Sequence, residues 1–230
     1  MKKTLFLSFI LTALALWGGP KDTIRTNFRL DFYMNEPQAE FLVRLPDSSA
    51  YAAATVTLFP PAAQAVSVSG EPGQILSLNV PIGRLPEGLT EMRYTVVSPQ
   101  GVAEEGKAVL RKLPYKWNAV QVDRKTGGVI VRGMPLIPYG FYCYSPVQPM
   151  IQEEETVRGF NLVSPYQNIP RSDRKMRKVY MDRAAELGMK VNYNLLSVAT
   201  GGTGYDRNQD SVRRVEMLKD EVRAFKDHPA

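Results

Sequence analysis

A unit of strand, loop and helix recurs through the second half of the sequence. The stretch from Gly133 to Tyr144, GMPLIPYGFYCY, is apolar and aromatic and lies between prolines. Because it is too short for a helix, it predicts a strand that is buried on both faces. The pattern then repeats, with a helix over 152–158, a strand from Phe160, a helix over 174–187, a strand over 190–196 and a helix that ends at His228 and Pro229.

The spacing of these strands indicates a particular architecture. They are expected to begin near residues 136, 160 and 190, which are 24 and 30 residues apart. A (β/α)8 barrel of about 250 residues uses about 31 residues for each of its eight units. The 97 residues from Met134 to Ala230 therefore predict the first three βα units of a TIM (β/α)8 barrel over 133–230, ending where a fourth strand would begin. The alternative is a complete small α/β domain with an open sheet.

The two longer helices are expected to bury apolar faces against this sheet. Helical spacing groups Met176, Tyr180, Ala184 and Leu187 in one helix, and Val212, Val215, Leu218, Val222 and Phe225 in the next. The basic run 171–178, RSDRKMRK, is expected to form a solvated face.

Residues 26–113 follow a different pattern, with seven short segments of alternating polarity and turn residues between them. In the first segment, Phe28, Leu30 and Phe32 fall on one face. No convincing helical period is present, so an all-β immunoglobulin-like sandwich is predicted. We expect it to brace its neighbour, with sugar binding as the alternative.

Residues 114–132 are interpreted as a connector that ends in a hairpin. Val120 and Val122 lead into a turn-rich loop, from which the apolar stretch 129–131 returns. Trp117 is expected to pack between the two domains, and a stacking platform is the alternative.

The N-terminus carries the pattern of an export signal. Two lysines precede an uncharged apolar run that ends at Trp17, which predicts a signal peptide over 1–18 and a secreted or periplasmic protein. An uncleaved membrane anchor is the alternative, although the apolar run is short for a membrane span. Once Lys2 and Lys3 are removed, the net charge falls from +6 to +4, which is too mild to indicate nucleic acid.

Single copies of cysteine and histidine restrict the chemistry. Cys143 cannot form an intramolecular disulfide and is expected to be a small buried hydrophobe. With one histidine, His228, the chain is a poor candidate for a Cys-His nucleophile or a metal site. The glycines in 201–204 lack the spacing and lysine of a phosphate-binding loop, so a flexible loop is expected and no cofactor or metal.

Several segments together resemble a known family. VDRKTGGVIVRGMPLIPYGFY, GFNLVSPYQ, YMDRAAELGMKVNYNLL and DEVRAFKDHPA, from Val122 onward, resemble the sandwich-plus-barrel glycoside hydrolases of polysaccharide-degrading bacteria. The resemblance implies that this chain is the N-terminal portion of a secreted hydrolase of poly- or oligosaccharides. The two catalytic carboxylates then stand on later strands, beyond Ala230, so no catalytic residue is named and the chain alone is expected to be inactive. Asp206 is expected in a solvated loop, with contact to a sugar hydroxyl as the alternative, and Asp173 is expected at a helix cap.

Substrate contacts are expected at the carboxyl ends of the barrel strands. The candidates are Tyr142, Tyr144, Tyr166, Gln167, Asn194 and Ser197. Aromatic rings suit the C–H faces of sugars, while amides and hydroxyls bind sugar hydroxyl groups; simple packing of the tyrosines under the rim is the alternative. The expected partner is a carbohydrate, with no nucleic acid, and with no membrane after signal removal. A non-catalytic carbohydrate-binding or surface adhesion protein is the competing hypothesis.

Overall fold

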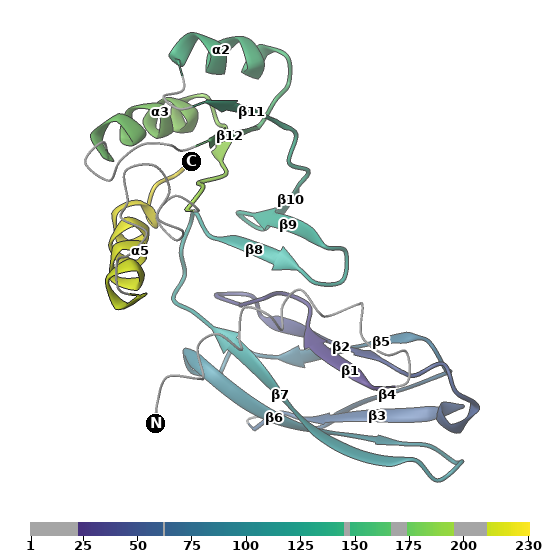
Figure 1. The fold of residues 1–230 in the computed structure, drawn as a ribbon. Helices are drawn as coiled ribbons and strands as arrows, with labels where there is room; N and C mark the ends of the chain where they lie inside the picture. Colours follow the sequence, from purple (N-terminus) through teal and green to yellow (C-terminus); the bar gives the residue numbers. More distant parts are fainter. Residues whose placement is uncertain (1–22, 62, 145–147, 167–173, 196–210) are drawn as a thin grey trace. The chain divides into compact units, whose positions relative to one another are not determined.

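The computed structural model describes residues 23–61, 63–144, 148–166, 174–195 and 211–230 (Figure 1). The chain forms two compact units, Met1–Pro135 (the first unit) and Leu136–Ala230 (the second unit). The predicted signal peptide lies outside the described residues. No helix among the described residues has both the length and the apolar character needed to cross a membrane.

The first unit contains the predicted β-sandwich. Its seven strands are β1 (Arg25–Phe28), β2 (Gln38–Arg44), β3 (Ala54–Phe59), β4 (Val66–Gly70), β5 (Ile75–Pro81), β6 (Gly88–Val97) and β7 (Ala103–Lys112), with a 3-10 turn at Ser49–Tyr51. They form two antiparallel sheets, in the orders β1-β2-β5 and β4-β3-β6-β7. Alternate residues of β3 and β5 are buried, and side chains such as Phe41, Leu58, Leu78 and Met92 fill the core. Period-two burial thus confirms the predicted sandwich.

The first strand is shorter than the sequence predicts. It ends at Phe28, after which Leu30 forms a single bridge with Asp123 and Tyr33 one with Lys112. The chain leaves β2 here and bonds to β7, so the regular alternation is lost. Consequently Tyr33 enters the core, whereas Phe32, which was predicted to share the face of Phe28, is only partly buried.

A three-stranded sheet follows the sandwich, in the order β10-β9-β8. It comprises β8 (Val120–Asp123), β9 (Gly128–Val131) and β10 (Met134–Leu136), which confirms the predicted hairpin. Between β9 and β10, Arg132 and Gly133 both have positive φ, as a two-residue type I′ turn requires. The prediction of one strand from 133 to 144 is therefore wrong. Met134–Leu136 completes the hairpin sheet, Pro138 offers no N–H for pairing, and the next strand begins at Gly140.

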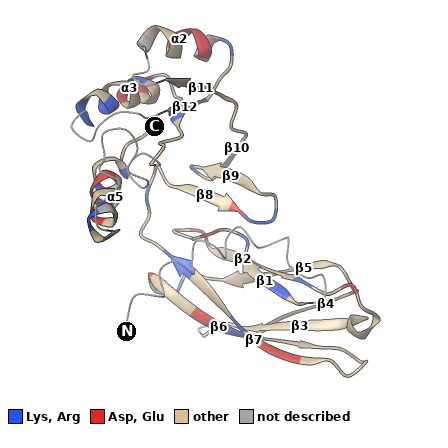
Figure 2. Cartoon of the chain, viewed as in Figure 1, with Lys and Arg blue, Asp and Glu red and all other residues tan. Residues whose placement is uncertain are grey.

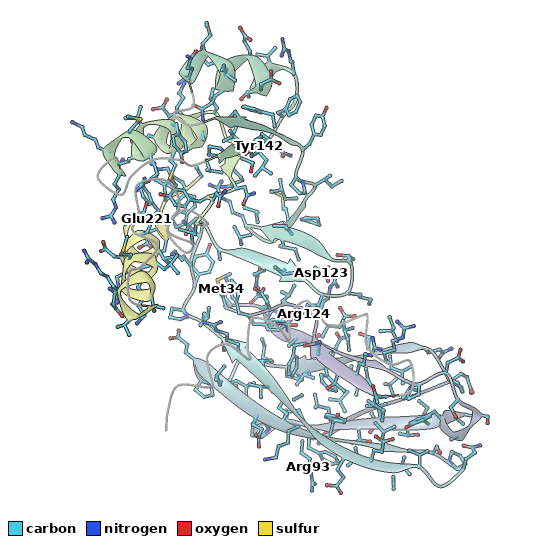
Figure 3. The ribbon with its side chains drawn as sticks, in the orientation of Figure 1. Met34, Arg93, Asp123, Arg124, Tyr142 and Glu221 are labelled. Atoms are coloured by element: carbon cyan, nitrogen blue, oxygen red, sulfur yellow. The ribbon has the colours of Figure 1, made fainter. Side chains whose placement is uncertain are left out.

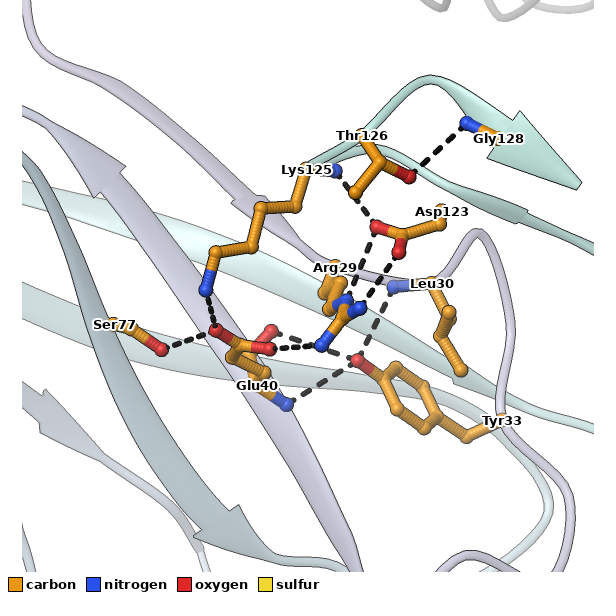
Figure 4. A network of polar contacts seen from close by, with 9 residues as sticks. All are labelled: Arg29, Leu30, Tyr33, Glu40, Ser77, Asp123, Lys125, Thr126 and Gly128. Carbon is orange, nitrogen blue, oxygen red and sulfur yellow. Dashed lines mark hydrogen bonds and ion pairs between the residues drawn. The ribbon is translucent and has the colours of Figure 1, made fainter. Parts of the chain in front are cut away.

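Charged side chains fasten the hairpin to the sandwich (Figure 4). Arg29 donates from Nε and Nη2 to the two carboxylate oxygens of Asp123 at 3.1 and 2.7 Å, and from Nη1 to Glu40 at 2.9 Å. Lys125 and Ser77 also donate to Glu40, at 2.6 and 2.5 Å. Burial acts to raise the pKa of Glu40, but these hydrogen bonds overcome it and lower that pKa from 4.5 to about 2. The segment expected to be a connector is thus part of the first unit.

Two aromatic side chains of that segment remain accessible. Trp117 is half-exposed, and the guanidinium carbon of Arg132 lies 4.6 Å from the centre of its ring. This is the geometry of a cation–π contact. The packing of Trp117 between domains stays a prediction. Tyr115 is 65% exposed.

The second unit alternates strands and helices in the predicted order. Its elements are β11 (Gly140–Tyr144), α2 (Pro149–Val157), β12 (Leu162–Tyr166), α3 (Arg174–Glu186), β13 (Lys190–Val191) and α5 (Ser211–Phe225). The strands are parallel and lie in sequence order, β11-β12-β13. β13 is shorter than expected, although the Asn192 N–H still donates to the Val163 carbonyl at 2.8 Å. The closed barrel stays a prediction.

Close contacts hold β11 against β12. A Cβ added to Gly140 would lie 2.3 Å from the backbone oxygen of Leu162, so only glycine fits this crossing. The side chain of Asn161 accepts from the Tyr139 N–H and donates to the Ile137 carbonyl, both at 2.9 Å. Asn161 thereby fixes the chain entering β11.

Both longer helices bury the predicted face only in part: Tyr180 and Ala184 are buried as predicted, and Leu187 and Phe225 pack against the same cluster. In α3 the buried residues are Arg177, Tyr180, Met181 and Ala184, whereas Met176 is exposed. In α5 the buried residues described are Met217 and Glu221, while Val212, Val215 and Val222 are exposed. The predicted solvated face of α3 is therefore wrong at Arg177.

The reason is an ion pair between the two helices. Arg177 is 2% and Glu221 1% exposed, and the Nη2 and Oε1 atoms lie 2.8 Å apart. Arg174 donates to the other Glu221 oxygen at 2.9 Å, and the Tyr193 hydroxyl donates to Glu221. Burial and the bond to Glu221 raise the pKa of Tyr193. Helical apolar spacing cannot show this cluster, because paired charges occupy the positions of hydrophobic residues.

Candidate functional site

The two faces of the β11-β12-β13 sheet carry different side chains. Phe141, Val163 and Val191 belong to or pack against the cluster that contains Tyr180 and Met181 of α3. Successive residues of a strand point to opposite faces, so the intervening positions lie on the face turned away from that cluster. These positions hold the candidate site.

Three polar side chains form a row across this second face. The register pairs Tyr142 with Ser164, and the Asn192 N–H bonds to Val163, so Asn192 follows Ser164 on the next strand. Asn192 donates from Nδ2 to the Ser164 hydroxyl at 3.1 Å. Tyr142, labelled in Figure 3, is 64% exposed, and Asn192 is also exposed. An aromatic ring, a hydroxyl and an amide are thus presented on adjacent strands.

The next positions along the strands contain further predicted residues. Tyr144 and Tyr166 are paired in the register. Asn194 follows the end of β13 and is partly exposed. The backbone thus brings the carboxyl ends of the strands together, as predicted for Tyr142, Tyr144, Tyr166 and Asn194. Gln167 and Ser197 lie outside the described residues, as do Asp173 and Asp206.

Ser164 and Asn192 were missed by the sequence interpretation, which considered only residues at the very ends of the strands. The alternation itself was a usable signal. Ser164 lies two positions before Tyr166, and Asn192 two positions before Asn194, so both share a face with predicted residues.

Charged groups are distributed unevenly around this row. The strand segments β11, β12 and β13 contain no carboxylate, whereas acidic and basic residues are interspersed on α3 and α5 (Figure 2). Lys190, the cation of the same face, donates from Nζ to the Pro229 carbonyl. In the part of the chain that the structure describes, no group of three or more His, Cys, Asp or Glu could hold a metal ion. The described row can therefore bind and orient a polar ligand, but it contains no carboxylic acid or carboxylate.

Cys143 lies on the opposite face and is partly buried against the core. Burial raises the pKa of its thiol, which opposes formation of the nucleophilic thiolate. This agrees with the predicted role as a small hydrophobe.

A second group of polar residues lies at the ends of α3 and α5. His228 Nε2 is 3.0 Å from Asp182 Oδ1, and the Ala230 N–H donates to His228 Nδ1 at 3.2 Å. Hydrogen bonds from Lys178 and then His228 lower the pKa of Asp182. A hollow of about 530 Å³ adjoins them, lined by Lys178, Asp182, Ala185, Glu186, Ala224, Asp227, His228 and Pro229. The hollow is lined by no Phe, Tyr or Trp, and its polar groups mainly pair with one another.

Comparisons with known proteins give no family. No family model and no curated protein matches this chain. A bacterial immunoglobulin-like domain from the M. primoryensis ice-binding adhesin is 11% identical to this chain. The match covers 40% of this chain and 95% of the adhesin domain, with a TM-score of 0.30.

Two solved hydrolases are also similar. For a β-glucuronidase from an uncultured Clostridium sp., the identity is 14%, the coverage is 91% of this chain and 36% of the enzyme, and the TM-score is 0.31. A Bacteroides ovatus xyloglucanase is 11% identical, the match covers 74% of this chain and 44% of the enzyme, and the TM-score is 0.26. This chain therefore spans less than half the length of either hydrolase. At TM-scores this low, the similarities decide neither its fold nor its function.

Proposed function

We propose that this chain is the N-terminal portion of a secreted glycoside hydrolase that acts on poly- or oligosaccharides, with the row of Tyr142, Ser164 and Asn192 in contact with the sugar. The observation that carries the proposal is the exposed row itself. A tyrosine ring can stack on the apolar C–H face of a sugar, while the hydroxyl and the amide bind its hydroxyl groups. Ligand sites commonly combine aromatic surface with a few convergent polar groups of this kind.

The proposed architecture explains why these strand ends matter. If β11, β12 and β13 are the first three strands of a (β/α)8 barrel, their carboxyl ends lie at the face where such barrels bind substrate. Glycoside hydrolysis also requires a carboxylate pair, which we assign to later strands. In this proposal, the described strands position the sugar and later strands supply the acid and the nucleophile or base.

The test combines turnover with binding. The 230-residue chain and a longer product of the same gene are assayed on a panel of polysaccharides, with turnover expected only from the longer protein. In the chain itself, Tyr142→Ala is expected to weaken saccharide binding by about 5-fold, since aromatic stacking contributes on the order of 1 kcal/mol. Tyr115→Ala is the matched control, because Tyr115 is 65% and Tyr142 64% exposed. Equal loss in both variants would contradict the assigned site.

The exposed row of Tyr142, Ser164 and Asn192 supports a second candidate equally well, a carbohydrate-binding or surface adhesion protein without catalysis. It predicts the same effect of Tyr142→Ala on binding. It differs in expecting no turnover from either protein on any member of the panel.

Export is part of the proposal. The Lys-Lys start and the uncharged run after it support cleavage near residue 18. Mass spectrometry of the exported protein should show a chain that lacks about the first 18 residues, as the length of such signals implies. An exported chain that retains Met1 would contradict this.

A further inference from the structure

We infer that the ligand of this row is an uncharged saccharide, held through two neighbouring hydroxyl groups by the Ser164–Asn192 pair. The inference rests on the proposed function and specifies the substrate class of the same site. It also moves the main polar contact from Asn194 and Ser197, which the sequence favours, to two residues that lie earlier on the strands.

The hydrogen-bonding capacity of the pair supports this assignment. In the part of the chain that the structure describes, the 3.1 Å bond between them is the one side-chain hydrogen bond of either residue. The Asn192 amide oxygen is left as an acceptor, and the Ser164 hydroxyl proton is left as a donor. Adjacent hydroxyls of a sugar ring can each donate and accept. One can therefore donate to Asn192 while the other accepts from Ser164.

The pair is also held in place before a ligand arrives. The Asn192 backbone is fixed by its bond to Val163, and Ser164 lies within β12. Binding groups whose geometry is already set lose less conformational freedom when they bind. Tyr142 is the Cα partner of Ser164 on the neighbouring strand, β11, so Ser164 lies between Tyr142 and Asn192 in the register.

The charges around the row argue against an acidic sugar. A uronate carboxylate is bound best by charge-assisted hydrogen bonds, typically from arginine or lysine. The strand segments that form the row contain one cation, Lys190, which lies two positions before Asn192 on the same face. Its Nζ donates to the Pro229 carbonyl. Among the described strand residues, a carboxylate placed on Ser164 and Asn192 would lose water without gaining a cation that is not already engaged. Neutral hydroxyls carry no such cost.

The experiment measures binding of defined oligosaccharides to the full chain. The neutral probes are cellohexaose, xylohexaose, mannohexaose and a xyloglucan heptasaccharide, and the acidic probes are an aryl β-glucuronide and oligogalacturonate. Isothermal titration calorimetry gives the dissociation constants at one salt concentration, so that charge effects are comparable. At least one neutral probe is expected to bind 10-fold or more tightly than both acidic probes.

Two variants locate the effect. Asn192→Ala and Ser164→Ala should each weaken binding of the neutral probe by about 3- to 10-fold, the usual effect of a lost neutral hydrogen bond. Asn79→Ala is the control, since Asn79 is an exposed asparagine on β5 of the sandwich. Both site residues are at least partly exposed, and thermal unfolding checks that the variants remain folded.

The outcomes separate this inference from the function on which it rests. Preferential binding of an acidic probe, or full affinity in Asn192→Ala and Ser164→Ala, would overturn the inference while leaving a carbohydrate-binding function in place. Failure to bind any saccharide in the panel would overturn both.

Discussion

Removal of the Asp123 carboxylate should detach the β8–β9 hairpin from the sandwich. Asp123 receives two hydrogen bonds from Arg29 and one from the Lys125 backbone N–H at 2.9 Å. The hydrogen bonds from Arg29 hold the pKa of Asp123 below its usual value. The change Asp123→Ala leaves Arg29 with Glu40 as its carboxylate partner, and it also removes the bond that orders the loop after β8.

The exposure of the two partners sets the size of the effect. The Asp123 side chain is 5% exposed, and that of Arg29 is 36% exposed. Breaking a fully buried pair costs about 3–5 kcal/mol, whereas an exposed pair contributes about 0.2–1 kcal/mol. A bidentate pair with one buried partner falls between these limits, so we expect Asp123→Ala to lower the free energy of unfolding by about 2–3 kcal/mol. The pair of Lys107 and Glu91, with side chains 69% and 58% exposed, should contribute less than about 0.5 kcal/mol.

Double-mutant cycles on the two pairs test this difference. Urea unfolding of the chain without residues 1–18, which removes Trp17, can be followed by the fluorescence of Trp117, which lies in the first unit. Arg29 with Asp123 should show a coupling energy above about 1.5 kcal/mol, and Lys107 with Glu91 one near zero. Equal coupling energies in the two cycles would refute the claim that this ion pair fastens the hairpin.

Three further predictions follow from buried or crowded positions. Replacing Glu221 by leucine removes the carboxylate that pairs with the buried Arg177 and should destabilise the second unit by about 3–5 kcal/mol, seen as faster proteolysis within Leu136–Ala230; unchanged proteolysis would contradict the buried pair. Gly140→Ala places a methyl group against a backbone oxygen and should cost about 1–3 kcal/mol, whereas Gly83→Ala, with open space around it, should cost little; equal effects would contradict the close crossing. Because folding lowers the pKa of Glu40 from 4.5 to about 2, the contribution of Glu40 to the free energy of unfolding is complete above pH 4.5 and is lost as the pH falls towards 2. Once solvent screening is allowed for, this contribution amounts to about 1–2 kcal/mol. Glu40→Gln should therefore reduce the loss of stability across that range, and an unaltered pH profile would contradict this pKa.

The sandwich could be predicted from local sequence because its signal is local. Alternation along β3 and β5 reports which side chains face the core, and turn residues separate the strands. The alternation of polar and apolar residues does not show where a segment changes its strand partner. The segment after Phe28 alternates as a strand would, yet its bridges to β7 and β8 depend on residues 79 and 93 positions away. Long-range pairing of this kind cannot be read from spacing.

The candidate site was predictable in outline for a similar reason. Strand ends follow from the repeat, which located Tyr142, Tyr166 and Asn194. The bond between Ser164 and Asn192 depends on the register of β12 against β13, which sequence spacing alone does not fix. The ion pair of Arg177 and Glu221 was missed because a charge on a helix is usually solvated. Only the positions of both helices show that it is paired and buried.

The location of the sugar can be measured by nuclear magnetic resonance. The full chain, labelled with nitrogen-15, is titrated with the neutral oligosaccharide that binds most tightly. The account predicts that the largest amide shifts occur at residues 140–144, 162–166 and 190–194, and that Asn192→Ala diminishes them. Shifts confined to the first unit, around Trp117 or on the sandwich, would contradict it.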